Sequence, residues 1–331
     1  MNMKNFFLKI LGLLIGFTIL FWLITTIGTR EFLENMSTAK ISDVICALTL
    51  VLFGIYLRAL RWKSLFLNEE QMGVYPFFSA IMIGALANNI LPARGGDLVR
   101  VYILGNNTSF SKSNILATVL IERLSDLLLV CFMSLLVVSA FPMQQWIQNV
   151  AMFVGGGSLV GLVVLMVLSN NPNSFFGLFL KLFNVFPKWI RIFLQPIIRD
   201  FMQGIKVVIS KRSVVFIILT ILIWGFEITT LWFFAKSFGF VLSFCESLFV
   251  MIHAVLSCFV PFVPAQIGVW ELSIQSSMTF LGYEGSAILA FALAWHFTLV
   301  FVGSFIGAVC LFLNGNSLFM TYTTAQEELK S

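Results

Sequence analysis

The chain consists of long apolar segments separated by helix breakers and charged residues. About 20 apolar residues carry a helix across the hydrocarbon core of a bilayer. Apolar windows of about this length or slightly shorter occur at residues 6–27, 41–60, 77–91, 114–140, 147–169, 213–237, 248–262 and 285–313. Only 11% of the residues are charged, whereas a soluble domain carries roughly a quarter. The sequence therefore predicts an all-α polytopic integral membrane protein.

Charge and cysteine content argue against several other classes. The net charge is +5, but the Lys and Arg residues follow the apolar windows and form no dense patch for a nucleic acid. The five Cys residues lie in or beside apolar segments and include no Cys-x-x-Cys pair, so no metal site is expected. Walker, Gly-x-Ser-x-Gly, His-Glu-x-x-His and dinucleotide-binding motifs are all missing. We therefore expect no cofactor and no enzymatic activity.

Basic residues indicate on which side of the membrane each connection lies. The connection 170–212 holds seven Lys and Arg residues and is predicted to be an amphipathic cytoplasmic segment, whereas 140–149 has none and is placed outside. By the same count, both flanks of 77–91 are cytoplasmic and both flanks of 248–262 are outside. These two segments are predicted to be re-entrant, which leaves six full spans and cytoplasmic termini. The alternative is a full crossing, because residues 71–93 are uncharged and long enough.

The whole chain, residues 1–331, is predicted to form one transmembrane domain with two halves, at about 1–140 and 147–315. Residues 6–27 are expected to be an uncleaved first span, because the apolar stretch exceeds that of a typical signal peptide. A further short helix is expected over Leu272–Leu281.

Two similar interruptions occur in the two halves. Pro92-Ala93-Arg94-Gly95-Gly96 and Pro264-Ala265-Gln266-Ile267-Gly268 share the pattern Pro-Ala-x-x-Gly, and an acidic residue follows each, Asp97 and Glu271. Pro and paired Gly break helices, and broken backbone at membrane depth survives only inside protein or around a water-filled cavity. Interrupted segments of opposite orientation are typical of transporter sites. The pattern predicts an inverted pseudo-repeat with a site at the breaks.

The first break is rich in charge, with Arg94, Asp97 and Arg100. One interpretation is a phosphate clamp, because Arg offers planar bidentate donors and Gly95-Gly96 lets backbone N–H groups approach an anion. The alternative is an ordinary loop in which Arg94 pairs with Asp97 and Arg100 meets lipid headgroups. The apolar surroundings favour the clamp.

Three more charges follow in the window 114–140. Glu122 and Asp126 are four residues apart and share a helix face, with Arg123 turned to one side. They could form a structural ion-pair cluster, bind a proton or cation, or neutralise Arg94 and Arg100 when no substrate is bound. The sequence leaves these possibilities open.

Single polar residues in apolar segments are Glu227, His253 and His296. The side chain of such a residue often makes a hydrogen bond to a neighbouring helix and has no further role. Glu227 is expected to face a cavity, since burying an isolated acid in lipid costs roughly 2.5–3.5 kcal/mol. Glu271 lies beside Trp270 and just beyond the second break, and it is a stronger candidate for a site residue than any of these three.

Four motifs together resemble the lysylphosphatidylglycerol synthase transmembrane region, a flippase-like domain family. They are Arg58-x-x-Arg61-Trp62, then Asn89-x-x-Pro92-x-Arg94-x-Gly96-Asp97-x-x-Arg100, then Glu122-Arg123-x-x-Asp126, then Pro264-x-x-x-Gly268-x-x-Glu271. The resemblance covers about residues 5–315, with Asp97 where the family more often has Glu. It implies a multi-pass protein of the bacterial plasma membrane with a lipid-translocating role. Only Asn314–Ser331 follows the last window, so the aminoacyl-transferase domain of the family's synthases is expected to be absent.

The leading hypothesis is a flippase or transporter of an anionic phospho- or glycolipid. The candidate substrate-binding residues are Arg94, Gly95, Gly96, Asp97, Arg100, Glu122, Arg123, Asp126, Pro264, Gly268 and Glu271, with Arg58, Arg61, Asn89, Glu227 and His253 as secondary candidates. In this hypothesis the arginines engage phosphate, and the acids supply counter-charge or proton coupling.

Two alternatives are a non-transporting scaffold for a separate lipid-modifying enzyme and an intramembrane enzyme with Glu122 or Asp126 as general base. Stand-alone members resemble proteins that handle hopanoids, glycolipids or polyprenyl lipids, which leaves the substrate open.

Overall fold

The computed structural model describes residues 34–66, 72–91, 95–141, 213–257 and 263–314, with isolated positions between 145 and 200. Within these ranges every regular element is a helix and no strand occurs. Among the described residues, three helical segments are long and apolar enough to cross a bilayer: Ile41–Lys63, Val214–Ser237 and Ala287–Leu313. The chain is a helical, multi-pass membrane protein. The predicted spans 6–27 and 147–169 and the connection 170–212 lie wholly or mostly outside the described residues, so the count of six spans stays a prediction.

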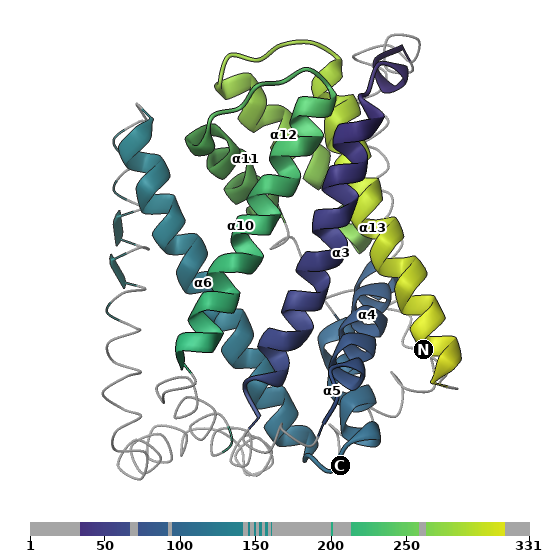
Figure 1. Ribbon diagram of the computed structural model, residues 1–331. Coiled ribbons are helices and arrows are strands. Elements are labelled where there is room, and N and C mark those ends of the chain that lie inside the picture. The colour runs from purple at the N-terminus through teal and green to yellow at the C-terminus, as the bar shows by residue number, and fades with distance from the viewer. Residues whose placement is uncertain are drawn as a thin grey trace, which may run out of the picture. The chain divides into compact units, whose positions relative to one another are not determined.

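The helices form two series with the same order of lengths (Figure 1). The first series is α3 (Ile41–Lys63, 23 residues), α4 (Tyr75–Ile90, 16), α5 (Gly96–Asn107, 12) and α6 (Lys112–Ala140, 29). The second is α10 (Ser213–Ser237, 25), α11 (Phe244–Ser257, 14), α12 (Val269–Phe280, 12) and α13 (Ala287–Leu313, 27). Each series runs long, short, short, long, and each Pro-Ala-x-x-Gly break separates the two short helices.

Helix α5 was not anticipated, because its polar residues mask its pattern. The sequence assigned these residues only to the cytoplasmic flank that follows 77–91. Asp97 and Arg100 interrupt an apolar face whose members Val99, Ile103 and Leu104 are almost fully buried. A helix with this composition stays attached to its neighbours by that buried face.

The chain divides into two compact units. Unit 1 comprises Met1–Ile55, Met82–Gly96 and Ile223–Gly315, and unit 2 comprises Tyr56–Ile81, Asp97–Leu222 and Asn316–Ser331. Each unit draws on both predicted halves. The assignment of one domain with halves at 1–140 and 147–315 stays a prediction.

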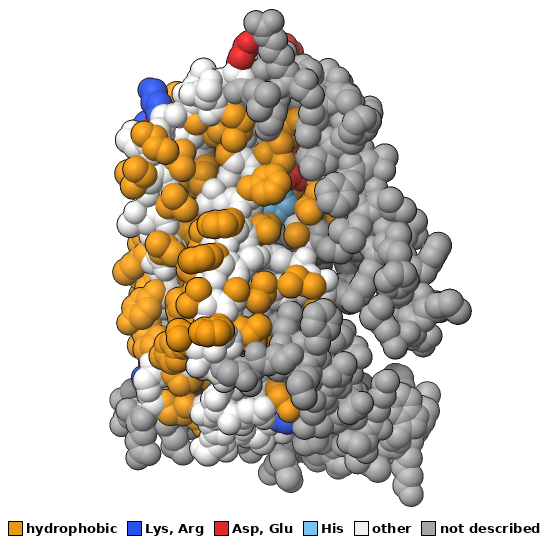
Figure 2. Space-filling view, turned by 90° about the vertical axis from the view of Figure 1, so that its right-hand side faces the viewer, with side chains coloured by type: hydrophobic (Ala, Val, Ile, Leu, Met, Phe, Trp, Pro, Cys, Tyr) orange, Lys and Arg blue, Asp and Glu red, His pale blue; other side chains and the backbone are white. Residues whose placement is uncertain are grey.

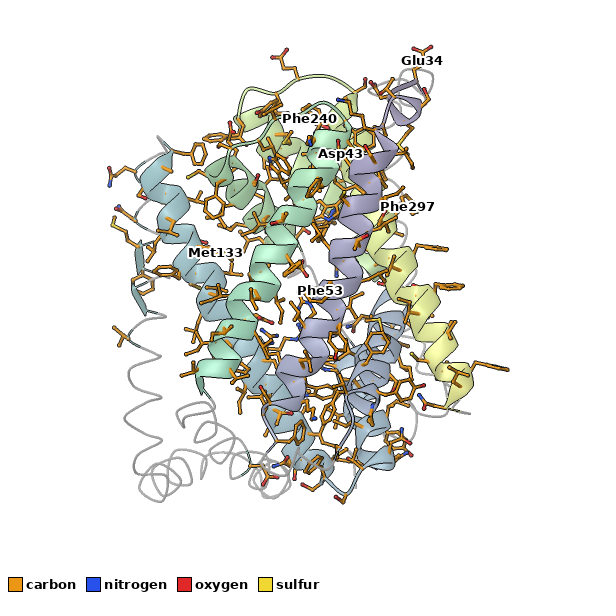
Figure 3. The ribbon with its side chains drawn as sticks, in the orientation of Figure 1. Glu34, Asp43, Phe53, Met133, Phe240 and Phe297 are labelled. Carbon is orange, nitrogen blue, oxygen red and sulfur yellow. The ribbon has the colours of Figure 1, made fainter. Side chains whose placement is uncertain are left out.

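Within unit 1, the first part of α3 runs antiparallel to α10. Three contacts join them, at Lys40–Ser237 (N···O 2.9 Å), Asp43–Lys236 (ion pair, 3.3 Å) and Phe53–Phe226 (ring centroids 5.1 Å). Residue numbers rise along one helix as they fall along the other, which defines the antiparallel direction. Asp43 and Phe53 mark this course on α3 (Figure 3).

The second part of α4 packs closely against α13, also within unit 1. A Cβ added to Gly307 would lie 2.3 Å from the carbonyl oxygen of Met82, and one added to Gly303 would lie 3.5 Å from Ala85. Small residues permit this close approach of helices in lipid. The predicted site residue Asn89 lies here, and its Nδ2 donates to Ser304 Oγ at 2.9 Å.

The other side of α13 is apolar and exposed. Phe297, Phe301, Phe305 and Phe312 recur every four to seven residues and each is more than half exposed. Phe297 points away from the helices around it (Figure 3). Orange side chains cover much of one face, with Lys and Arg near its ends (Figure 2). In water such a surface would aggregate, so it is a lipid-facing surface.

Candidate functional site at the two helix breaks

The first break depends on a glycine that touches the preceding helix. Gly96 begins α5, and its N–H donates to Asn88 Oδ1 at 2.8 Å. A Cβ at Gly96 would lie 2.0 Å from the carbonyl oxygen of Gly84. Only glycine allows the start of α5 to lie on α4 in this way. Gly95 is buried beside it, whereas Pro92–Arg94 fall outside the described residues.

Beyond this break, unit 2 contains a cluster of six charged side chains, which we call the ion cluster. Its members are Arg61 from α3, Asp97 and Arg100 from α5, and Glu122, Arg123 and Asp126 from α6. Three positive charges meet three negative ones. Five of the six were primary candidates from the sequence, and Arg61 was only a secondary one.

Arg61 is the most deeply buried member of the ion cluster, with 2% of the residue exposed. Its Nη1 and Nη2 donate to the two carboxylate oxygens of Asp126 at 2.6 and 3.1 Å, and Nη2 also donates to Glu122 Oε1 at 3.4 Å. Bidentate contacts of this kind are the strongest ion pairs in proteins. Arg61 is therefore a main cation for the acidic pair on α6. The sequence had considered these acids as counter-charges for Arg94 and Arg100, and Glu122 does lie 3.0 Å from Arg100 Nη1.

Arg123 and Asp97 form the accessible edge of the ion cluster. Arg123 Nε and Nη2 donate to the two oxygens of Asp97 at 3.1 and 2.7 Å. The Arg123 side chain is 41% exposed and that of Asp97 is 21% exposed. Arg123 is indeed turned away from the shared face of Glu122 and Asp126, as helix geometry predicted.

Arg100 is buried but incompletely hydrogen-bonded. Its Nη1 lies 3.0 Å from Glu122 Oε2, and its Nε lies 3.3 Å from Asp97 Oδ1 without the alignment of a hydrogen bond. Nε and Nη2 are buried and have no hydrogen-bond partner among the described residues. Burial lowers the pKa of Arg100, and the carboxylates of Glu122 and Asp97 offset only part of that effect. These two nitrogens form one edge of the guanidinium, the edge that grips an oxyanion with two parallel bonds.

Trp62 fixes the plane of Arg100. The Arg100 guanidinium carbon lies 4.8 Å from the centre of the Trp62 ring. The indole is fully buried, donates from Nε1 to Thr118 Oγ1 at 3.0 Å, and packs edge-on against Phe77. A cation above such a ring gains about 2 kcal/mol or more when desolvated. The sequence motif included Trp62, but no role was predicted for it.

The second break has a different backbone. Pro264–Gln266 form a single 3-10 turn in which Ala265 and Gln266 have φ of 49° and 54°, and Gly268 follows with φ of 83°. Positive φ at a residue other than glycine costs of the order of 1–3 kcal/mol. The chain then enters α12, whose first turn contains Glu271.

Glu271 is almost fully buried and is held on both oxygens. Oε2 accepts from the N–H of Gly268 at 2.7 Å, and Oε1 lies 2.6 Å from His296 Nδ1 on α13. The His296 ring stacks on Trp270 at 5.1 Å. All of these residues belong to unit 1. His296 was not among the predicted site residues, because a lone His in an apolar window gives no sign of its partner.

The secondary candidates have plainer environments. His253 Nδ1 lies 2.8 Å from the carbonyl oxygen of Phe249 in its own helix. Glu227 and Arg58 are half-buried on α10 and α3, and each has at least one polar or electrostatic partner. The part of the chain that the structure describes contains no group of His, Cys, Asp and Glu able to hold a metal ion.

Comparisons with known proteins assign the chain to a family. The chain is 22% identical to a UPF0104 membrane protein of Pyrococcus horikoshii over 94% of this chain and 98% of that protein. It is 23% identical to UPF0104 membrane proteins of Methanothermobacter thermautotrophicus, over 77% and 80% of the two chains, and of Methanocaldococcus jannaschii, over 74% and 78%. No solved structure matches. The family model described as lysylphosphatidylglycerol synthase TM region matches residues 9–307, so the chain belongs to that family.

Proposed function

We propose that the protein moves an anionic lipid between the leaflets of its membrane and has no enzymatic activity of its own. The observation that carries this proposal is Arg100. Its Nε and Nη2 are buried and lack hydrogen-bond partners among the described residues. A phosphate oxygen pair satisfies both donors at once, which a single carbonyl or a water molecule does not.

The surroundings of Arg100 suit a phosphate headgroup. Trp62 orients the guanidinium, and Glu122 holds its far side through Nη1. An arriving phosphate replaces Asp97 beside Arg100, while Asp97 stays bound to Arg123. In the sequence, Gly95 and Gly96 directly precede Asp97, and Arg94 adds a second positive charge before them.

The repeat supplies a route across the membrane. The two helix series share their order of lengths, and α3 and α10, which begin the two series, run antiparallel. In an inverted repeat the α4–α5 and α11–α12 breaks enter from opposite sides, and rocking about them gives alternating access. Six full spans with both termini in the cytoplasm complete this proposal.

Lipid translocation in proteoliposomes tests the phosphate site. Arg100→Lys keeps the charge that faces Glu122 but cannot present the Nε–Nη2 edge. We expect this variant, and the double variant Arg94→Ala with Arg100→Ala, to move a fluorescent phosphatidylglycerol at least about tenfold more slowly, since one bidentate bond is worth about 1.5–3 kcal/mol. The matched control is Lys236→Ala, which removes a cation paired with Asp43 outside the ion cluster. Unchanged translocation in both Arg100 variants would contradict the proposal.

A non-transporting scaffold for a lipid-modifying enzyme is the second candidate. One observation favours it, the balance of three positive and three negative charges in the ion cluster, which is also what a purely structural cluster requires. This candidate predicts that Arg100→Lys has no effect on lipid movement and that the protein co-purifies with a lipid-modifying enzyme. Lipid profiles of a deletion strain separate the two functions. A displaced lipid supports translocation, and a missing lipid supports a role in lipid modification.

A further inference from the structure

The second break contains a buried acid–imidazole pair that the phosphate site does not use. The Glu271 side chain is 1% exposed and that of His296 is 7% exposed, and their polar atoms are 2.6 Å apart. Every residue within one helical turn of Glu271 on α12 is uncharged. Resting on the proposed function, we propose that Glu271 and His296 form a proton-binding site that couples a proton gradient to lipid movement.

The charge of the pair changes by one when a single proton binds. With neutral His296, the pair carries the negative charge of the Glu271 carboxylate. With protonated His296 it is an ion pair without net charge. The N-terminus of α12 adds about half a positive charge, delivered through the Gly268 N–H to Glu271 Oε2. The site then carries about −0.5 in one state and about +0.5 in the other, so neither state has a large excess charge to bury.

Besides the pair itself, the two helices that pack against α12 carry four titratable residues: Cys245, Glu246, His253 and Cys310. Helix α12 packs against α11 and α13. On α11, Glu246 accepts from the backbone N–H of Ser243 and His253 bonds to its own helix. Cys245 is exposed near the start of α11, and Cys310 lies fourteen residues beyond His296 on α13. The part of α4 that packs on α13, from Met82 to Ile90, has no titratable residue.

Proton binding is linked to the backbone of the break. The Glu271 carboxylate accepts from the Gly268 N–H, directly after the positive φ values of Ala265 and Gln266. A charged carboxylate accepts this hydrogen bond more strongly than one whose charge is shared with an imidazolium. Changing the proton occupancy therefore alters the contact that holds the strained turn at the start of α12.

Trp270 provides a direct readout of the proton, because protonated imidazole quenches the fluorescence of an indole on which it stacks. The two rings lie 5.1 Å apart and 20° from parallel. The chain has eight Trp residues, so the signal of Trp270 is the difference between the wild type and Trp270→Phe. We expect this difference to fall as the pH is lowered from about 8 to 5. His296→Gln should abolish the change. His253→Gln is the matched control and should leave the change intact.

The coupling itself is measured in proteoliposomes with and without an imposed pH gradient. We expect the gradient to accelerate phosphatidylglycerol movement in the wild type, whereas Glu271→Gln and His296→Gln should each move lipid at the same rate with and without the gradient. A Trp270 signal that is independent of pH, or that survives in His296→Gln, overturns the proton site. Equal acceleration in wild type and variants overturns the coupling. Absence of any lipid movement in the wild type overturns the proposed function and the coupling with it, while the fluorescence still decides whether the pair binds a proton.

Discussion

The two breaks share a sequence pattern but differ in chemistry. Both place a Pro-Ala-x-x-Gly sequence between a short apolar helix and a helix of 12 residues. The first break leads into an ion cluster with three arginines, and the second leads to one acid paired with one histidine. We propose a phosphate ligand for the first and a proton for the second. A repeated sequence pattern is compatible with two different ligands, because the Pro and Gly positions do not determine which side chains surround the break.

The largest expected loss of folding stability comes from breaking the ion cluster, and it is compared with the loss from breaking an ordinary ion pair. Arg61→Met leaves Asp126 and Glu122 buried without their main cation, and we expect it to destabilise the protein by about 3–5 kcal/mol. Lys236→Met removes the half-exposed partner of Asp43 and should cost less than about 1 kcal/mol. Chemical unfolding in detergent measures both. Equal losses would mean that the ion cluster contributes no more than a surface pair.

The next largest loss of stability is expected from replacing the glycine of each break by alanine, and the two glycines should differ in cost. Gly96→Ala places a Cβ against the backbone of Gly84 and should cost about 3 kcal/mol, the upper part of the range for overpacking. Gly268→Ala forces a non-glycine residue to a φ of 83° and should cost about 1–2 kcal/mol. Gly225→Ala is the control, since α10 has space there. If Gly268→Ala proved the more damaging, the close approach at Gly96 would be wrong.

A smaller effect compares the two tryptophans. Trp62 donates to Thr118 and lies under Arg100, whereas Trp270 Nε1 is buried without a hydrogen-bond partner among the described residues. Replacing either by Phe removes a similar volume. We therefore expect Trp62→Phe to cost about 1 kcal/mol more than Trp270→Phe, the value of one buried hydrogen bond. Unfolding midpoints of the two variants give this difference directly, and a reversed order would argue against the orientation of Trp62.

The smallest effect is expected at one of the two histidines. His253 bonds only to its own helix, so His253→Phe should change stability by about 0.5 kcal/mol or less. His296→Phe removes the partner of Glu271 and should cost about 1–3 kcal/mol. Thermal unfolding in detergent compares them. Similar values would show that the Glu271–His296 contact has little energetic weight.

Most of the described helices could be predicted from the sequence, because apolar windows and helix breakers act over residues that are close together along the chain. The apolar window 213–237 coincides with α10, and 114–140 differs from α6 by two residues at its start. The window 248–262 began four residues after the start of α11 at Phe244, because Phe244–Ser247 include the polar residues Glu246 and Ser247, and its end lies outside the described residues. The partners at the sites were less predictable. Glu122, Arg123 and Asp126 were recognised as a group, but Arg61 and His296 were ranked low because their partners lie 65 and 25 residues away.

The sequence by itself determined the membrane class, the apolar helices and the two breaks. These follow from composition and from Pro and Gly, whose effects act within a few residues. Only the tertiary structure decided that Arg61 binds Asp126, that Arg100 keeps one guanidinium edge without a hydrogen bond among the described residues, and that Glu271 meets His296. Ion pairing in a low-dielectric interior depends on distances between helices, and the spacing of residues along one helix does not set those distances.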